Sequence, residues 1–140
     1  MRKFFISSHG HMASGLKSSL EILMGKADNV TVFDAYVNED RVEDQVEAFF
    51  KTLEEGDQAI LMSDLYGGSV NQVLYRYLDR PETYLIAGVN LGLVIELVVM
   101  SQMPVSIEDL RNAVEAAREG LQVCTLDDNT TAANDEEDFY

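Results

Sequence analysis

The chain has 140 residues, the length of one domain, and 46% of them are hydrophobic, so its core needs no disulfide or metal. Ten lysines and arginines against 25 aspartates and glutamates give a formal net charge of −15. This balance disfavours both nucleic-acid binding, which requires a basic face, and electrostatic docking on anionic lipid. The single cysteine, Cys124, excludes an intrachain disulfide and fits a reducing compartment.

Two hydrophobic periods alternate along the first 126 residues. Short apolar runs predict strands, and stripes with helical spacing predict helices. In chain order we predict a strand at 3–8, a helix ending at Gly25, a strand at 30–36, a helix from 42 that stops at Gly56, a strand at 59–63, a helix at 70–78, a strand at 83–87, a helix at 91–100, a helix from 107 to Gly120, and a short strand at 121–126. This alternation indicates an α/β fold: an open, mostly parallel four-stranded sheet with helices on both faces.

Two further segments bear on organisation. The longest apolar run, residues 91–100, contains Glu96 and is too short for a membrane span, so we expect a cytoplasmic protein with no direct membrane insertion. Residues 127–140 hold six acids and no bases, with no apolar period. We interpret residues 1–126 as one domain and residues 127–140 as an acidic, disordered tail.

Both histidines of the chain lie in the tripeptide His9-Gly10-His11, after the first predicted strand. Open α/β sheets place their functional crevice beyond the carboxyl ends of the strands. A neutral imidazole there is a good nucleophile near neutral pH, so His9 is the candidate catalytic residue. We expect His11 to begin the following helix and assign it no role.

Two groups after the third strand complete a possible site. Asp64 can hold the Nδ1 proton of His9 if the first and third strands are neighbours, although an ordinary turn residue is the simpler interpretation. Gly67-Gly68-Ser69 begins a helix and is typical either of an anion cradle or of a turn with Ser69 as N-cap. No Walker or G-x-G-x-x-G motif occurs, so we expect no nucleotide cofactor. A nucleophilic histidine, an orienting carboxylate and an anion cradle together indicate phosphoryl transfer through a phosphohistidine.

Three segments then carry a resemblance to a known family: Ser8-His9-Gly10, Ser63-Asp64-Leu65-Tyr66-Gly67-Gly68-Ser69-Val70-Asn71, and Ala87-Gly88-Val89-Asn90-Leu91. They resemble the enzyme IIA domain of the mannose (mannose–fructose–sorbose) family of the bacterial phosphoenolpyruvate-dependent sugar phosphotransferase system. The likeness extends to about Leu126. It implies that His9 is phosphorylated, that Asp64 is its hydrogen-bonding partner and that Ser69 contacts the phosphoryl group.

The resemblance also implies partners. The phosphocarrier protein HPr would donate the phosphoryl group, and enzyme IIB would accept it and serve the membrane IIC/IID complex. Family members are homodimers that exchange a C-terminal strand, which matches the predicted strand at 121–126. Because an acidic tail stands where many relatives have a linker to IIB, we expect IIB on a separate polypeptide.

Three alternatives remain open. One is the phosphotransferase subunit that serves dihydroxyacetone kinase, which shares this fold but has no Tyr-Gly-Gly insertion after the third strand. A second is a metallohydrolase that uses His9, His11 and Asp64 as ligands. A third is a regulatory dimer without catalysis, although such a protein would be expected to lack His9 or Asp64.

Overall fold

The computed structural model describes residues 1–127, and in this range the chain forms one parallel sheet covered by helices. The elements are, in chain order, β1 (Arg2–His9), α1 (Met12–Met24), β2 (Val30–Ala35), α2 (Val42–Lys51), β3 (Gln58–Ser63), α3 (Ser69–Tyr75), β4 (Thr83–Ala87), α4 (Leu91–Val99) and α5 (Ile107–Arg118). The predicted order of strands and helices is confirmed through α5. The acidic tail predicted at 127–140 lies, apart from Asp127, outside the described residues.

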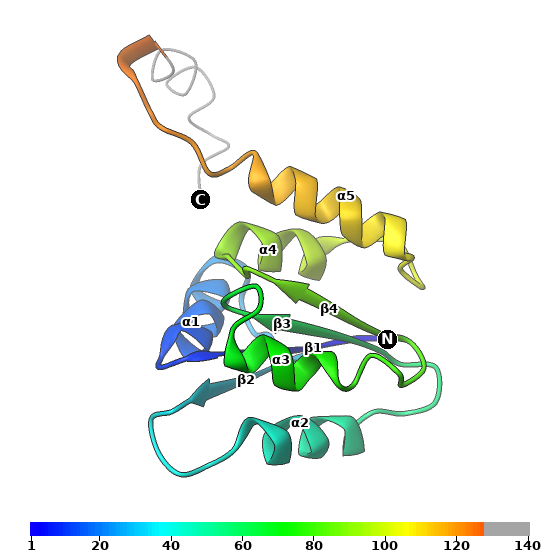
Figure 1. Cartoon of the computed structure of the whole chain (residues 1–140). Helices are drawn as coiled ribbons and strands as arrows, with labels where there is room; N and C mark the ends of the chain where they lie inside the picture. Colours follow the sequence, from blue (N-terminus) through cyan, green and yellow to red (C-terminus); the bar gives the residue numbers. More distant parts are fainter. Residues whose placement is uncertain (128–140) are drawn as a thin grey trace.

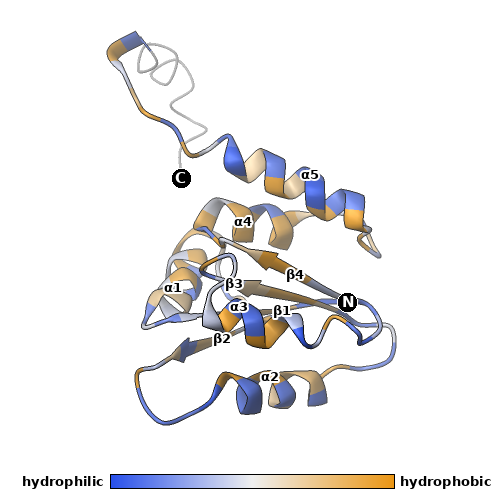
Figure 2. Cartoon of the chain, in the orientation of Figure 1, coloured by the Kyte–Doolittle hydropathy of each residue, from blue (hydrophilic) through white to orange (hydrophobic). Residues whose placement is uncertain are grey.

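Helices cover both faces of the sheet, and each face has its own hydrophobic core. Figure 1 shows α2 and α3 on one side, α1 and α4 on the other, and α5 beyond α4. Alternate residues of β1 point to opposite cores: Phe5 packs with α2 and α3, whereas Phe4 and Ile6 pack with α1 and α4. Strands buried on both faces read as continuous apolar runs, and Figure 2 shows hydrophobic colouring along the sheet and α4.

The strand order β2-β1-β3-β4 determines where the functional residues meet. All three strand pairs are parallel, and β1 lies between β2 and β3. The chain leaves β1 toward β2 on one side and later returns to β3 on the other, so the topological switch point lies between β1 and β3. Because Ser7 pairs with Ser63, the next residues of both strands, through His9 and Asp64, emerge at the same edge.

The C-terminal part of the described chain differs from the sequence expectation. Residues 121–125 have no regular secondary structure, and residues 126–127 are helical. A strand needs a partner for its backbone hydrogen bonds, and the segment leads away from the sheet of its own chain after α5 (Figure 1). Residues 121–126 therefore form no strand in the single chain, and their exchange with a second copy stays a prediction.

Candidate active site at the carboxyl edge of the sheet

His9 and Asp64 form a hydrogen-bonded pair at the switch point. His9 is the last residue of β1, and Asp64 directly follows β3. Oδ2 of Asp64 accepts two hydrogen bonds from the same residue, one from the His9 backbone N–H and one from the imidazole Nδ1, each 2.8 Å long. Oδ1 of Asp64 accepts from the Leu65 N–H at 3.1 Å. The carboxylate is thus held by the backbone on both sides of the crevice.

The charge of Asp64 determines the protonation pattern of the imidazole. Burial favours the neutral acid, but the hydrogen bonds from the His9 backbone and ring outweigh it and hold the pKa of Asp64 below its ordinary value of 3.8. An ionised carboxylate only accepts hydrogen bonds, so Nδ1 of His9 carries the proton. The lone pair of the neutral ring is therefore on Nε2, the nitrogen that can act as a nucleophile. The His9 side chain is 44% exposed, which leaves this ring accessible to a partner.

Ser69 lies against the reactive side of the imidazole. Its Oγ is 3.3 Å from Nε2 of His9. The N-cap of α3 is Gly68, and Ser69 is the first helical residue, so the expectation of Ser69 as N-cap is wrong. Its hydroxyl faces the site instead of the helix backbone.

Two glycines precede the first helical residue of α3, and each suits its place. A Cβ on Gly68 would lie 3.2 Å from Cβ of Leu65, which is tighter than ordinary packing, and 3.7 Å from Cε1 of His9, which is ordinary van der Waals contact. Gly67 has a φ of +75°, which glycine adopts without strain. Their N–H groups bond within the chain, from Gly67 to Oδ1 of Asn71 and from Gly68 to the Leu65 carbonyl. In this structure these two N–H groups are therefore occupied, whereas the anion cradle considered from the sequence would need them free.

Tyr36 is a site residue that sequence reasoning missed. It follows β2 directly, and its ring lies beside the His9 imidazole with centroids 5.1 Å apart. Its hydroxyl is 2.6 Å from Oγ of Ser69. The signal that could have identified it was its position. Tyr36 follows the second strand, and the residues that follow parallel strands lie at the same carboxyl edge of the sheet.

His11 belongs to a different cluster. It is the N-cap of α1, and its Nδ1 lies 3.0 Å from Oδ2 of Asp34. Asp34 also accepts from the Ser14 N–H at 2.9 Å and the Ser14 hydroxyl at 2.6 Å. Burial raises the pKa of Asp34, but the bonds from Ser14 and His11 outweigh it and hold the pKa below 3.8. Asp34 therefore caps the first turn of α1 from a neighbouring strand, where a negative charge is favourable.

This division of partners bears on the metal alternative. The ring of His9 faces Asp64 and the ring of His11 faces Asp34, so the three proposed ligands do not converge on one point. Among residues 1–127, no group of three or more His, Cys, Asp or Glu side chains is arranged to hold a metal ion. The geometry gives no support to the metallohydrolase interpretation.

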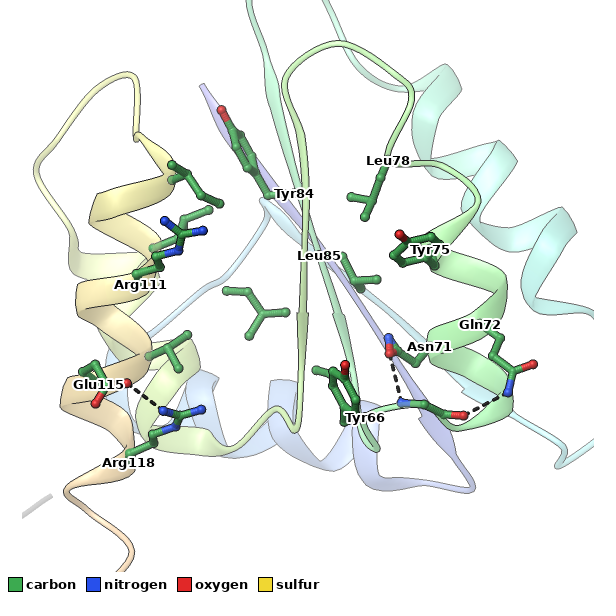
Figure 3. Close-up of a pocket in the computed structure, with 16 residues that line it drawn as sticks. Tyr66, Asn71, Gln72, Tyr75, Leu78, Tyr84, Leu85, Arg111, Glu115 and Arg118 are labelled. Carbon is green, nitrogen blue, oxygen red and sulfur yellow. Dashed lines mark hydrogen bonds and ion pairs between the residues drawn. The ribbon is translucent and has the colours of Figure 1, made fainter.

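A groove follows the free edge of the sheet, near the site. It has a volume of about 1020 Å³ and runs along β4 between α3 and α5 (Figure 3). Its lining includes Tyr84 and Ile86 of β4, and Leu110 and Val114 of α5. His9 is not part of this lining, which joins the site only through the loop residue Tyr66 and its neighbour Gly67. The groove thus marks the free edge of the sheet and is separate from the imidazole.

Comparison with known proteins gives consistent matches over most of the chain. A family described as "PTS system fructose IIA component" matches residues 3–115. The "PTS system mannose-specific EIIAB component" of Escherichia coli K12 is 30% identical over 122 residues, covering 84% of this chain and 38% of that protein. The chain thus spans well under half the length of this relative. The "PTS system fructose-specific EIIA component" of Bacillus subtilis is 23% identical, with 89% and 88% of the two chains covered.

Solved structures agree. The structure described as a "putative phosphoenolpyruvate-dependent sugar phosphotransferase system (PTS) permease" from Klebsiella pneumoniae is 34% identical and has a TM-score of 0.80, with 88% of this chain and 90% of that chain covered. The mannose/sorbose-specific IIA subunit from Enterococcus faecalis has a TM-score of 0.76 at 21% identity, covering 89% and 96%. The latter likeness shows the fold alone. Among residues 1–127, no helix combines the length and apolar composition needed to cross a membrane.

Proposed function

Because the chain belongs to the IIA components of the mannose and fructose family of sugar phosphotransferase systems, we propose that His9 is its phosphoryl carrier. Membership of this family gives the chain a role in sugar phosphotransfer. The single observation that supports His9 is its pair with Asp64, in which one carboxylate oxygen accepts from both the ring and the backbone of the same histidine. This pair lies at the switch point of the sheet and has an exposed imidazole.

The proposed step is an in-line phosphoryl transfer to Nε2. The lone pair of Nε2 forms a bond to phosphorus while the bond between phosphorus and the donor atom breaks, and its electron pair stays with the donor. The ring becomes cationic, and its Nδ1 proton remains hydrogen-bonded to Asp64, whose negative charge stabilises the cation. Ser69 Oγ, 3.3 Å from Nε2, is placed to donate to a phosphoryl oxygen. Transfer to the acceptor reverses these changes.

The donor and acceptor in this proposal are proteins of the same system. HPr donates the phosphoryl group to His9, and enzyme IIB accepts it and passes it on at the membrane IIC/IID complex. The crevice has an open, 44% exposed imidazole, as required when the second reactant is a protein side chain. The formal charge of −15 favours partners with a basic docking face. The chain acts in the cytoplasm, peripheral to that complex.

A homodimer with an exchanged C-terminal strand completes the proposal. β4 is an edge strand, and the apolar groove along it lies between α3 and α5 (Figure 3). Leu121 and Val123 of the segment after α5 are both highly exposed and spaced so that they would share one face of a strand. An edge strand accepts such a segment by backbone hydrogen bonding. Analytical ultracentrifugation of the full chain and of a Leu121→Asp, Val123→Asp variant tests this: the proposal expects a dimer that the substitutions dissociate.

Phosphorylation by the purified system tests the proposed carrier. The chain is incubated with phosphoenolpyruvate, enzyme I and HPr, and the phosphorylated peptide is mapped under alkaline conditions that preserve phosphohistidine. The proposal expects HPr-dependent label on the peptide that contains His9, and transfer of that label to enzyme IIB. Label on another residue, or no label when HPr is active on a known IIA protein, contradicts the proposal.

A further inference from the structure

Tyr36 has an unusual backbone for an aromatic residue. Its φ is +67°, in the left-handed region, where residues with a Cβ are uncommon. The backbone just before it is fixed, because the Ala35 carbonyl accepts from the Gly10 N–H at 2.8 Å and Ala35 is buried. A residue retained in such a conformation points to a requirement for its side chain.

The side chain explains what the conformation achieves. It turns Tyr36 back over the carboxyl edge of the sheet, where its ring lies beside His9 with centroids 5.1 Å apart at an interplanar angle of 44°. Its hydroxyl reaches Oγ of Ser69 at 2.6 Å, and that oxygen is in turn 3.3 Å from Nε2 of His9. A chain of polar atoms therefore runs from the tyrosine hydroxyl through the serine to the nucleophilic nitrogen.

We infer that Tyr36 is a phosphoryl-binding residue whose hydroxyl, together with that of Ser69, forms a two-donor cradle for a phosphoryl group on Nε2 of His9. This inference rests on the proposed role of His9. In the unmodified protein the two hydroxyls bond to each other, and one of their protons is used in that contact. When phosphate oxygens arrive, both O–H groups turn and donate to them, and no atom or electron is exchanged between protein and phosphoryl group in this rearrangement.

The ring of Tyr36 has a separate, positioning effect. It packs on one side of the imidazole, and Oγ of Ser69 lies 3.3 Å from Nε2. The imidazole is thus held by the ring of Tyr36 on one side and by the hydrogen bond between Nδ1 and Asp64. Rotation of the ring out of the line of transfer would break all of these contacts.

Two substitutions separate the hydroxyl from the ring, and a third is the matched control. Tyr36→Phe removes only the hydroxyl, and Tyr36→Leu also removes the aromatic ring. Tyr75→Phe removes the hydroxyl of another exposed tyrosine, which lies at the end of α3 remote from Ser69. All three are placed in a His11→Ala background, and circular dichroism checks their folding.

Chemical phosphorylation tests the cradle without any partner protein. Phosphoramidate transfers its phosphoryl group to imidazole nitrogen and releases ammonia. We expect the ³¹P resonance of phospho-His9 to shift in Tyr36→Phe but not in Tyr75→Phe, and hydrolysis to be about 2- to 10-fold faster, the effect of one lost hydrogen bond. Tyr36→Leu should hydrolyse at least as fast as Tyr36→Phe.

Transfer from phospho-HPr provides the second measurement. Tyr36→Phe should lower kcat by about 10-fold, with KM for phospho-HPr nearly unchanged, because the hydroxyl acts on the phosphoryl group and not on the donor protein. An unchanged ³¹P resonance and lifetime in Tyr36→Phe, or an effect confined to KM, overturns the inference. Should HPr fail to phosphorylate the wild-type chain while the phosphoramidate results hold, the proposed donor is wrong and the cradle stands.

Discussion

The two histidines, separated only by Gly10, have the same kind of partner but opposite environments. Each places Nδ1 on an aspartate oxygen, at 2.8 Å for His9 and 3.0 Å for His11. His9 is 44% exposed and has an aromatic ring, a serine hydroxyl and a glycine around its imidazole, whereas His11 is 80% exposed. The aspartate of His9 lies in the crevice at the switch point of the sheet, and the aspartate of His11 caps a helix. A His–Asp pair is therefore not sufficient evidence of a site, and its surroundings decide the role.

The largest expected effect is the difference between the two alanine variants. His9→Ala should abolish phosphoryl uptake from phospho-HPr because the attacking nitrogen is lost, and His11→Ala should retain uptake near the wild-type level. Uptake of ³²P, followed by gel and by peptide mapping, measures both. Uptake that persists in His9→Ala would move the carrier elsewhere and break the comparison.

The two aspartates should also differ in their effect on transfer. Asp64→Asn keeps the shape of the side chain but removes the charge that stabilises the imidazole cation, and we expect about a 10- to 100-fold lower rate of phosphorylation. Asp34→Asn should change the rate much less, since Asp34 binds the start of α1. Rapid-quench kinetics with phospho-HPr measures both rates, and equal losses would show that the carboxylates share one function.

For stability, Asp34 should matter more than Asp64. The Asp34 carboxylate caps α1, so Asp34→Ala should lower the free energy of unfolding at about pH 7 by about 1–2 kcal/mol. The pKa of Asp34 is lower in the folded chain than its ordinary value of 3.8, so its stabilisation is complete above that value and is lost as the pH falls through the folded pKa. The stabilities of the wild type and Asp34→Ala, measured by urea unfolding, should therefore converge as the pH falls below 3.8. A difference that is independent of pH would contradict this assignment.

The smallest expected effect concerns long-range charge. With a formal charge of −15, association with a phosphocarrier that presents a basic face should slow as salt screens the attraction. Stopped-flow measurements should give association rates with HPr that depend equally on salt for the wild type and for His11→Ala. The reason is that neither His–Asp pair sets the overall charge of the chain. Rates that do not change with ionic strength would remove electrostatic steering from the proposal.

Much of the fold was predictable because strands and helices differ in hydrophobic period. The runs at Phe4–Ile6 and Ala59–Met62 are apolar throughout since both faces of the sheet are covered. The meeting of His9 with Asp64 also follows from rules of topology, once the first and third strands are taken as neighbours. What sequence reasoning could not supply was orientation: the Ser69 hydroxyl faces the imidazole while Gly68 takes the N-cap position.

Tyr36 shows why local rules miss such residues. Its positive φ is not encoded by glycine or asparagine, the residues that usually signal this conformation, and its neighbours predict a simple continuation of β2. The conformation becomes visible only when Ala35 is seen bonded to Gly10 across the two strands. The segment at 121–126 is a different case: it is not a strand in the single chain, and its pairing with a second copy stays a prediction.

The double hydrogen bond to Oδ2 of Asp64 has one more consequence. One of the two bonds comes from the backbone N–H of residue 9, so it does not depend on the histidine side chain. In a His9→Gly protein, Asp64 would consequently stay in place beside the space left by the ring. Imidazole added to the solution could then bind there and substitute for the missing side chain. The backbone thus positions the carboxylate independently of the nucleophilic ring, so an added imidazole can bind at the site without refolding its surroundings.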